Sequence, residues 1–118
     1  MHGIDPDTEE AVRRFLALIA VRYNVAGAIL YGSRARGTHH DESDADVAVL
    51  LKGEPSHYKT VMDMAKSSFR VLLETRIPIS PLPIWLDEWE HPENYPNPVL
   101  LYHIRHEGIP LKMSQEPI

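Results

Sequence analysis

No cysteine occurs among the 118 residues, so the chain can form neither a disulfide framework nor a thiolate metal site. Long apolar runs are also missing, and no segment approaches the length of a membrane span. The first residues, MHGIDPDTEE, lack the apolar stretch of a secretory signal peptide. A net charge of −5 argues against a general nucleic-acid-binding surface, which would be basic. We therefore expect a cytoplasmic protein that binds neither membranes nor nucleic acid directly.

The residues that are present suffice for one small domain over residues 1–118, because 43% of them are hydrophobic. Apolar positions recur every three to four residues in some segments and form short continuous runs in others, which separates helices from buried strands. Helices are expected at about residues 8–23, 56–75 and 97–108, and strands at 25–31, 44–51 and 77–86. The order helix–strand–turn–strand–helix–strand–helix predicts an α/β domain.

Several helix ends carry their own signals. Asp7, three residues before Glu10, predicts a capping box at the start of the first helix. Asn97 and Pro98 suit the N-cap and first position of the last helix, and Gly108 suits its end. That last helix is expected to turn Leu101 and Ile104 toward the core.

The segment at 77–86 reads IPISPLPIWL, and its three prolines cannot donate hydrogen bonds to a neighbouring strand. This segment is therefore expected to be an edge strand or a partly paired one. The polar residues at 87–95 are expected to be irregular. On the preceding helix, one face is expected to carry Val61, Met64, Ala65, Ser68, Leu72 and Thr75.

The stretch YGSRARGTHHDESDADVAVLL carries the chemistry, and its acidic half comes first. Asp44 and Asp46 are two residues apart at the start of a strand, so both side chains point to the same face. Two neighbouring carboxylates repel one another, and a divalent cation offsets that repulsion. Mg²⁺, or Mn²⁺ in its place, prefers such oxygen ligands together with substrate phosphates. The pair predicts a metal-triphosphate site.

The other half of the stretch is a glycine-serine turn that follows a strand. Gly32 permits close approach of the backbone to a ligand, and free N–H groups at the start of a helical turn bind anions. The Ser33 hydroxyl adds a donor, and Arg34 and Arg36 bring positive charge to the same loop. One helical turn is expected here, closed by Gly37. Beside the carboxylate pair, this loop predicts a site for nucleotidyl transfer from ATP or another nucleoside triphosphate.

These residues match a known pattern. Gly32-Ser33, ten intervening residues and then Asp44-Ala45-Asp46 followed by Val-Ala-Val-Leu resemble the signature of the DNA polymerase beta-like nucleotidyltransferase superfamily. The chain is most similar to the minimal, single-domain members, often called MNT proteins. The likeness extends to ISPLPIW and to NPVLLYHIRHEGIPL, and covers about residues 8–111.

The resemblance implies a mixed sheet of three or four strands flanked by helices. It implies that Gly32 and Ser33 hold the triphosphate and that Asp44 and Asp46 ligate Mg²⁺ and serve catalysis. Many MNT proteins are antitoxins of a helical HEPN-type toxin, and some transfer AMP from ATP to a tyrosine of that toxin. The resemblance therefore implies a protein adenylyltransferase whose partner is a HEPN-family toxin.

One position departs from the superfamily pattern. The superfamily usually supplies a third carboxylate from the next strand, and here Ser80 falls about where that acid is expected. Asp87 and Glu88 are the next acids along the chain and are candidates to replace it. The departure leaves an alternative open, in which the domain is a weak or inactive nucleotide-binding antitoxin that neutralises its partner by binding. Transfer to a small molecule such as an aminoglycoside is a third reading.

Other residues with reactive or aromatic side chains have simpler interpretations. A transition-metal role is the less favoured interpretation for His39, His40, His103 and His106, which suit loop and surface positions better. The late aromatic residues either pack in the core or form a surface for a partner or a homo-oligomer. These are Trp85, Trp89, Tyr95 and Tyr102.

Overall fold

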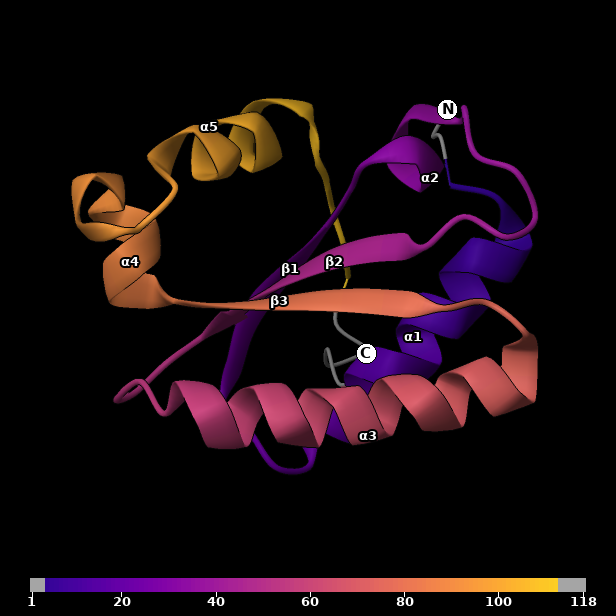
Figure 1. Cartoon of the computed structure of the whole chain (residues 1–118), viewed down its shortest axis with the longest axis horizontal. Coiled ribbons are helices and arrows are strands. Elements are labelled where there is room, and N and C mark those ends of the chain that lie inside the picture. The colour runs from indigo at the N-terminus through magenta and orange to yellow at the C-terminus, as the bar shows by residue number, and fades with distance from the viewer. Residues whose placement is uncertain (1–3, 113–118) are drawn as a thin grey trace.

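The computed structural model describes residues 4–112, and its centre is a four-stranded sheet in the order β3-β2-β1-β4 (Figure 1). The strands are β1 (Val25–Tyr31), β2 (Ala45–Leu51), β3 (Ile79–Trp85) and β4 (Ile109–Pro110). The helices are α1 (Pro6–Ala20), α2 (Ser33–Arg36), α3 (His57–Thr75), α4 (Leu86–Glu90), the 3₁₀ turn η1 (Pro92–Asn94) and α5 (Pro98–Glu107). Strand β1 is antiparallel to β2 and β4, whereas β2 and β3 are parallel. The predicted mixed α/β fold is confirmed.

Helices cover both faces of this sheet. Helices α1 and α3 lie below it in Figure 1, and α2, α4 and α5 lie above it. The odd-numbered residues of β2, such as Val47 and Val49, are buried with Phe15 of α1 in the larger core. Ala48 belongs to a smaller core on the opposite face with Ile104 of α5. A strand that is buried on both faces explains the continuous apolar run of β2.

The first helix begins two residues earlier than its sequence signal suggested. The cap is Asp5, whose carboxylate accepts a 2.8 Å hydrogen bond from the Thr8 N–H, and Pro6 is the first helical residue. The capping box predicted from Asp7 and Glu10 is therefore wrong, because proline fixes a helical backbone angle one residue after a good cap.

Residues 87–95 are more regular than expected. They contain the rest of α4 and the turn η1. The Glu88 carboxylate accepts a 3.0 Å hydrogen bond from the Trp85 N–H, which secures the start of α4 directly after β3. The prediction of an irregular segment was wrong. The hydrogen bond from Trp85 to Glu88, three residues later, caps a helix directly at the end of the strand.

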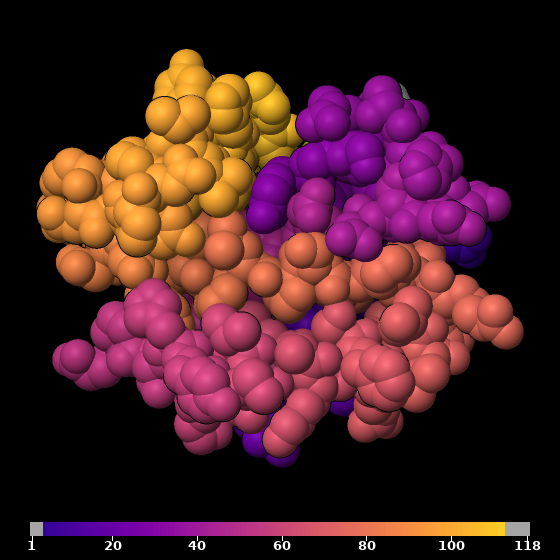
Figure 2. All heavy atoms as spheres, in the orientation of Figure 1, coloured from indigo at the N-terminus to yellow at the C-terminus, as the bar shows by residue number. Residues whose placement is uncertain are grey.

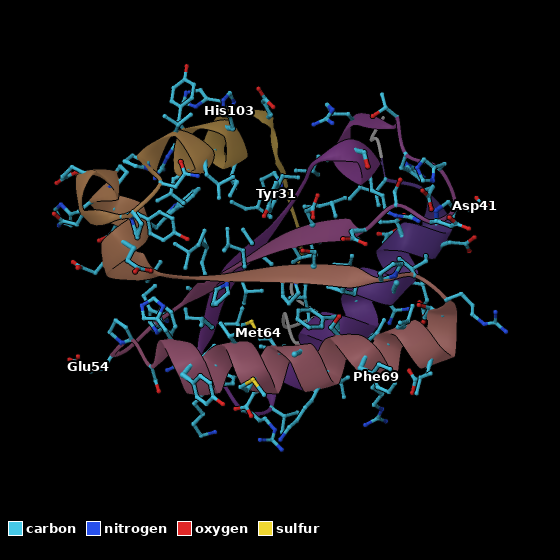
Figure 3. The ribbon with its side chains drawn as sticks, viewed as in Figure 1. Tyr31, Asp41, Glu54, Met64, Phe69 and His103 are labelled. Atoms are coloured by element: carbon cyan, nitrogen blue, oxygen red, sulfur yellow. The ribbon has the colours of Figure 1, made fainter. Side chains whose placement is uncertain are left out.

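Helix α3 packs on the sheet through a face that overlaps the expected one in part, since Met64 is buried as predicted and Ser68, Leu72 and Thr75 are half-buried. Thr60, Met64 and Val71 are buried, whereas Val61 and Ala65 remain exposed. Figure 3 shows Met64 turned toward the sheet. Within residues 4–112, no helix has the length and apolar content that crossing a bilayer requires.

Strand β3 lies at the edge of the sheet, as its prolines predicted. Along β3, the backbone N–H and C=O groups of successive residues point alternately toward β2 and toward the open edge of the sheet. The Pro78 carbonyl bonds to β2 through the Ala45 N–H at 2.8 Å, which places Pro81 and Pro83 at positions that face outward. Proline at these positions removes the N–H groups that another strand would need.

Gly108 ends α5 as expected, but its backbone is extended rather than left-handed, with φ −79°. Its role is packing. A Cβ at this position would overlap the Cγ2 atom of Ile29 and lie 2.6 Å from the Ile104 carbonyl oxygen. The chain therefore needs glycine where α5 turns into β4 against β1.

Replacing Gly108 by alanine should lower the free energy of unfolding by about 2 kcal/mol, because the added methyl overpacks the smaller core. Chemical denaturation measures this change. Gly27→Ala is the matched control, since its Cβ would meet only Leu50 at an ordinary 3.6 Å. Equal stability of the two variants would contradict the packing role.

Candidate active site

Three side chains stand in a row across the sheet. In the strand register, Asp46 of β2 pairs with Tyr31 of β1 on one side and with Ser80 of β3 on the other. Asp44 lies one residue before β2 and is exposed. Tyr31 was not singled out from the sequence, although a β1–β2 hairpin register would have placed it beside Asp46. Figure 3 shows it on the upper side of the sheet, between α2 and α5.

Gly32 is required by the carboxylate of Asp46. The glycine has φ +78°, which is strained for other residues, and a Cβ there would overlap Asp46 Oδ2. The turn before α2 therefore lies directly against Asp46 of the acidic pair. The predicted proximity of the glycine-serine turn and the aspartates is what the fold produces.

The turn itself forms as predicted. The N–H groups of Ala35 and Arg36 both donate to the Gly32 carbonyl oxygen at 3.1 Å, and Gly37 closes the turn in the left-handed region with φ 77°. The first N–H groups of a helical turn have no acceptor within that turn, so those of Ser33 and Arg34 fall at its open end. A phosphate contact of Ser33 stays a prediction.

The acidic pair is only partly compensated. Burial raises the pKa of Asp46, and the neighbouring Asp44 carboxylate raises it further. The Arg36 charge and a hydrogen bond from the Ser80 hydroxyl act in the opposite direction on that pKa. Two carboxylates with leftover repulsion are a donor set that fits a hard divalent cation, with further oxygens supplied by phosphate and water.

Tyr31 adds no charge to this pair at neutral pH. Burial and the Asp46 charge raise the pKa of its phenol to about 12, and Tyr95 contributes to the same effect. The phenol therefore remains protonated beside the aspartates and can donate a hydrogen bond.

The two arginines of the loop differ in their surroundings. Arg34 is 3% exposed, and its guanidinium donates to the Thr8 hydroxyl at 2.7 Å and to the Ser43 carbonyl at 2.9 Å. It also donates to the Asp41 carbonyl at 3.1 Å. These contacts give Arg34 a structural role that ties α1 to the loop before β2, and its predicted phosphate contact stays a prediction. Arg36 is exposed, and its positive charge acts to lower the pKa of Asp46.

Among residues 4–112, no third acid joins the pair. Ser80 occupies the position beside Asp46, as expected. The idea that Asp87 or Glu88 could replace it is wrong, because both follow the far end of β3, about 16 Å or more along the strand from Ser80. Glu88 is moreover bonded to the Trp85 N–H. Among residues 4–112, no three histidine, aspartate or glutamate side chains gather as a metal-binding group.

The histidines noted in the sequence have local partners. His39 Nε2 lies 2.8 Å from Asp5 Oδ2, and His103 Nδ1 lies 3.2 Å from Glu107 Oε2. His106 Nδ1 lies 2.9 Å from the Tyr102 carbonyl oxygen. His103 and His106 thus bond within α5, whereas His39 connects its loop to the start of α1.

The late aromatic residues mostly pack. Trp85 is buried in the larger core, and Trp89 and Tyr95 pack against the smaller one. Arg105 lies 4.0 Å above the Trp89 ring, a favourable cation–π contact. Tyr102 remains 58% exposed.

The comparisons agree with this geometry. The family model described as "Polymerase beta, Nucleotidyltransferase" matches residues 16–82, more than half of the chain. That range contains the glycine-serine turn, both aspartates and Ser80. The chain belongs to the polymerase beta nucleotidyltransferase family.

A solved structure from Sulfolobus solfataricus, described as a "putative nucleotidyltransferase", has the same fold. It superposes with a TM-score of 0.59 at 17% sequence identity, over 94% of this chain and 85% of that one. A search of curated proteins found no match. Polymerase beta-type nucleotidyltransferases generally use a nucleoside triphosphate and a divalent metal, and the acidic pair suits the metal.

Replacing Arg34 by methionine should cost about 3 kcal/mol of unfolding free energy, because buried acceptors on Thr8 and the loop lose their donor. Arg36→Met, at an exposed position, should change stability by less than about 0.5 kcal/mol. Urea denaturation compares the two. Similar stability losses would contradict the division of roles.

Asp46→Asn should make the protein without nucleotide more stable at neutral pH. The pKa of Asp46 is raised in the folded state, so its ionisation costs stability as pH rises through that pKa. The gain from Asn should therefore shrink as the pH is lowered toward the ordinary aspartate value of 3.8. Denaturation midpoints from pH 4 to pH 8 measure it, with exposed Asp87→Asn as control. If the stability gained from Asp46→Asn instead grows toward low pH, the interpretation of a raised Asp46 pKa is refuted.

Proposed function

We propose that the domain transfers AMP from Mg-ATP to a tyrosine hydroxyl of a HEPN-type toxin and thereby acts as its antitoxin. The observation that carries the transfer reaction is the packing of the Asp46 carboxylate against Gly32, which joins an acidic pair to an anion-binding turn. The partner class and the choice of ATP follow from the likeness to MNT proteins in the sequence around this site.

The residues have separate tasks in this proposal. Gly32 and Ser33 bind the triphosphate through the open end of the turn, and the exposed Arg36 adds positive charge there. Asp44 and Asp46 hold Mg²⁺ or Mn²⁺. The bound cation neutralises phosphate charge and orients the triphosphate for displacement.

The transfer is a single displacement at the α-phosphorus. The tyrosine oxygen forms a bond to phosphorus, and the bond from phosphorus to the oxygen that bridges the α- and β-phosphates breaks. Pyrophosphate leaves with that electron pair, and the proton of the hydroxyl passes to water. The turn, through its contact with Asp46, keeps phosphate and cation ligands at a fixed separation.

Ser80 favours a second candidate function. A serine hydroxyl is a weak Mg²⁺ ligand beside carboxylates, and here it donates to Asp46. In this alternative the nucleotide site is weak or inactive, and the domain neutralises its partner by binding. The two functions differ in whether neutralisation requires the aspartates.

The decisive assay incubates the chain with α-labelled ATP, Mg²⁺ and the product of the adjacent gene. Wild type should label the partner, and Asp44→Asn with Asp46→Asn should reduce labelling by at least 100-fold, because removal of an essential electrostatic group costs about 2.7–4 kcal/mol of barrier. Millimolar Mg-ATP should also raise the melting temperature of wild type alone. If the double variant neutralises the partner as well as wild type does, and neither protein labels the partner, the result supports neutralisation by binding alone.

Ser80→Asp tests the carboxylate number directly. A third acid in register with Asp46 should tighten Mg²⁺ binding and raise the labelling rate, while increasing repulsion in the protein without metal. Ser80→Asn is the matched control, since it has a similar size and no charge. A rate for Ser80→Asp no higher than that of Ser80→Asn would rule out a restored third ligand.

A further inference from the structure

An apolar groove runs between α3 and the open edge of β3. Figure 2 shows the furrow between the orange β3 and the pink α3. Its volume is about 410 Å³. The apolar lining from α3 includes Val61, Ala65 and Phe69, and β3 contributes Pro81 and Pro83. We call this the α3–β3 groove.

A stripe of exposed apolar side chains on α3 continues the groove outward. Tyr58 is 80% exposed, Met62 43%, Phe69 60% and Leu73 66%. With Ala65 they are spaced by four, three, four and four residues, the spacing of a seam that packs against another helix. The opposite side of α3 already packs on the sheet, so this outer stripe is a second apolar face without a partner in the described structure. Clustered exposure of this kind marks an interaction surface.

The edge of β3 limits what can occupy this surface. A strand added to the edge would need outward N–H groups, and Pro81 and Pro83 supply none. The outward Ile79 carbonyl accepts a 2.6 Å hydrogen bond from the Ser68 hydroxyl, and the outward Trp85 N–H bonds to Glu88. The occupant must therefore pack by its side chains, which favours a helix over a strand.

A basic row flanks the outer stripe, and Lys66, its one member without an acidic partner among residues 4–112, sets the charge that suits an occupant. Lys59, Lys66 and Arg70 follow one another at helical spacing beside it. Asp63 pairs with Lys59 at 2.9 Å, and Glu74 with Arg70 at 3.2 Å. Lys66 has no acidic partner among residues 4–112. A helix with acidic residues beside its apolar face complements this row.

A second copy of the chain fits less well. Tyr58 and Leu73, and likewise Met62 and Phe69, are equally far from the point between residues 65 and 66. A two-fold axis there would pair the apolar residues but would also bring Lys66 next to Lys66 of the second copy. The repulsion between these two charges favours a different, acidic partner.

We propose that the α3–β3 groove and the outer stripe of α3 dock an amphipathic, acidic-flanked helix of the protein that accepts the nucleotide. The assignment of this helix to the acceptor rests on the proposed function. Asp44 and Ser80 also line this groove, so a docked protein would lie beside Asp44, one residue of the acidic pair. Docking would thus present the acceptor at the site of transfer.

The first test uses two fluorescein-labelled helical peptides of four heptads, both with leucine at the core positions. One carries glutamate at the flanking positions and the other carries lysine. Fluorescence anisotropy with the full chain should show at least tenfold tighter binding of the glutamate peptide, with a difference that shrinks at high salt. Equal binding of both, or binding of neither, overturns the proposal.

Point variants locate the binding surface. Phe69→Glu should weaken binding of the glutamate peptide at least tenfold. Val21→Glu is the matched control, because Val21 is 85% exposed and lies after the end of α1. Thermal unfolding checks that both variants fold. Undiminished binding to Phe69→Glu overturns the docking surface, as does a wild-type dimer that Phe69→Glu dissociates in sedimentation experiments.

A tyrosine added to the glutamate peptide separates docking from catalysis. Labelling from Mg-ATP that Asp46→Asn abolishes, with unchanged peptide affinity, supports both. Binding without any labelling leaves the docking surface standing and counts against the proposed function. Labelling that Phe69→Glu leaves unchanged supports the function and overturns the docking surface.

Discussion

The contact between the Asp46 carboxylate and the backbone at Gly32 is the constraint on which the candidate site depends. Gly32 has a positive φ that only glycine adopts without strain, and a side chain there would also overlap the Asp46 carboxylate. The same contact sets the separation between carboxylate oxygens and the open N–H groups of the turn. Because β1 and β2 pair directly, the sheet holds both sides of this contact. Asp46 and Gly32 are therefore positioned by the pairing of β1 with β2.

Behind the contact, burial supplies the rigidity. The odd-numbered residues of β2 are inaccessible to solvent on the α1 and α3 side, and Ala48 is inaccessible on the α5 side. A strand fixed on both faces holds Asp46 in place, and Asp44 directly precedes that strand. Arg34 extends this rigidity to the loop that precedes β2, since its guanidinium spans from Thr8 of α1 to the loop carbonyls. Repulsion within the partly compensated carboxylate pair destabilises the folded state, and the packing around β2 offsets this loss of stability.

Local signals were enough to predict the strands β1 and β2, the turn closed by Gly37 and the cap at Asn97. Each of these depends on a few consecutive residues. The role of Arg34 could not be predicted, because its acceptors come from distant segments that only the tertiary fold brings together. The inward face of α3 was predicted only in part, correctly for Met64 and wrongly for the exposed Val61 and Ala65. Its outer stripe is as apolar as its core-facing side, so periodicity alone cannot tell which side the sheet covers.

Ser80 makes charge balance the central question for catalysis. Compared with a site of three carboxylates, a site with two has less charge repulsion when no cation is bound. It also offers the cation fewer protein oxygens. Such a site gains most from the surroundings that a partner provides. An acceptor seated in the α3–β3 groove would cover the rim at Asp44 and exclude water there, and lower water content strengthens every charge interaction at the pair. Docking and catalysis would then be linked through one residue, so that a domain with a weak site in isolation becomes competent only with its acceptor in place.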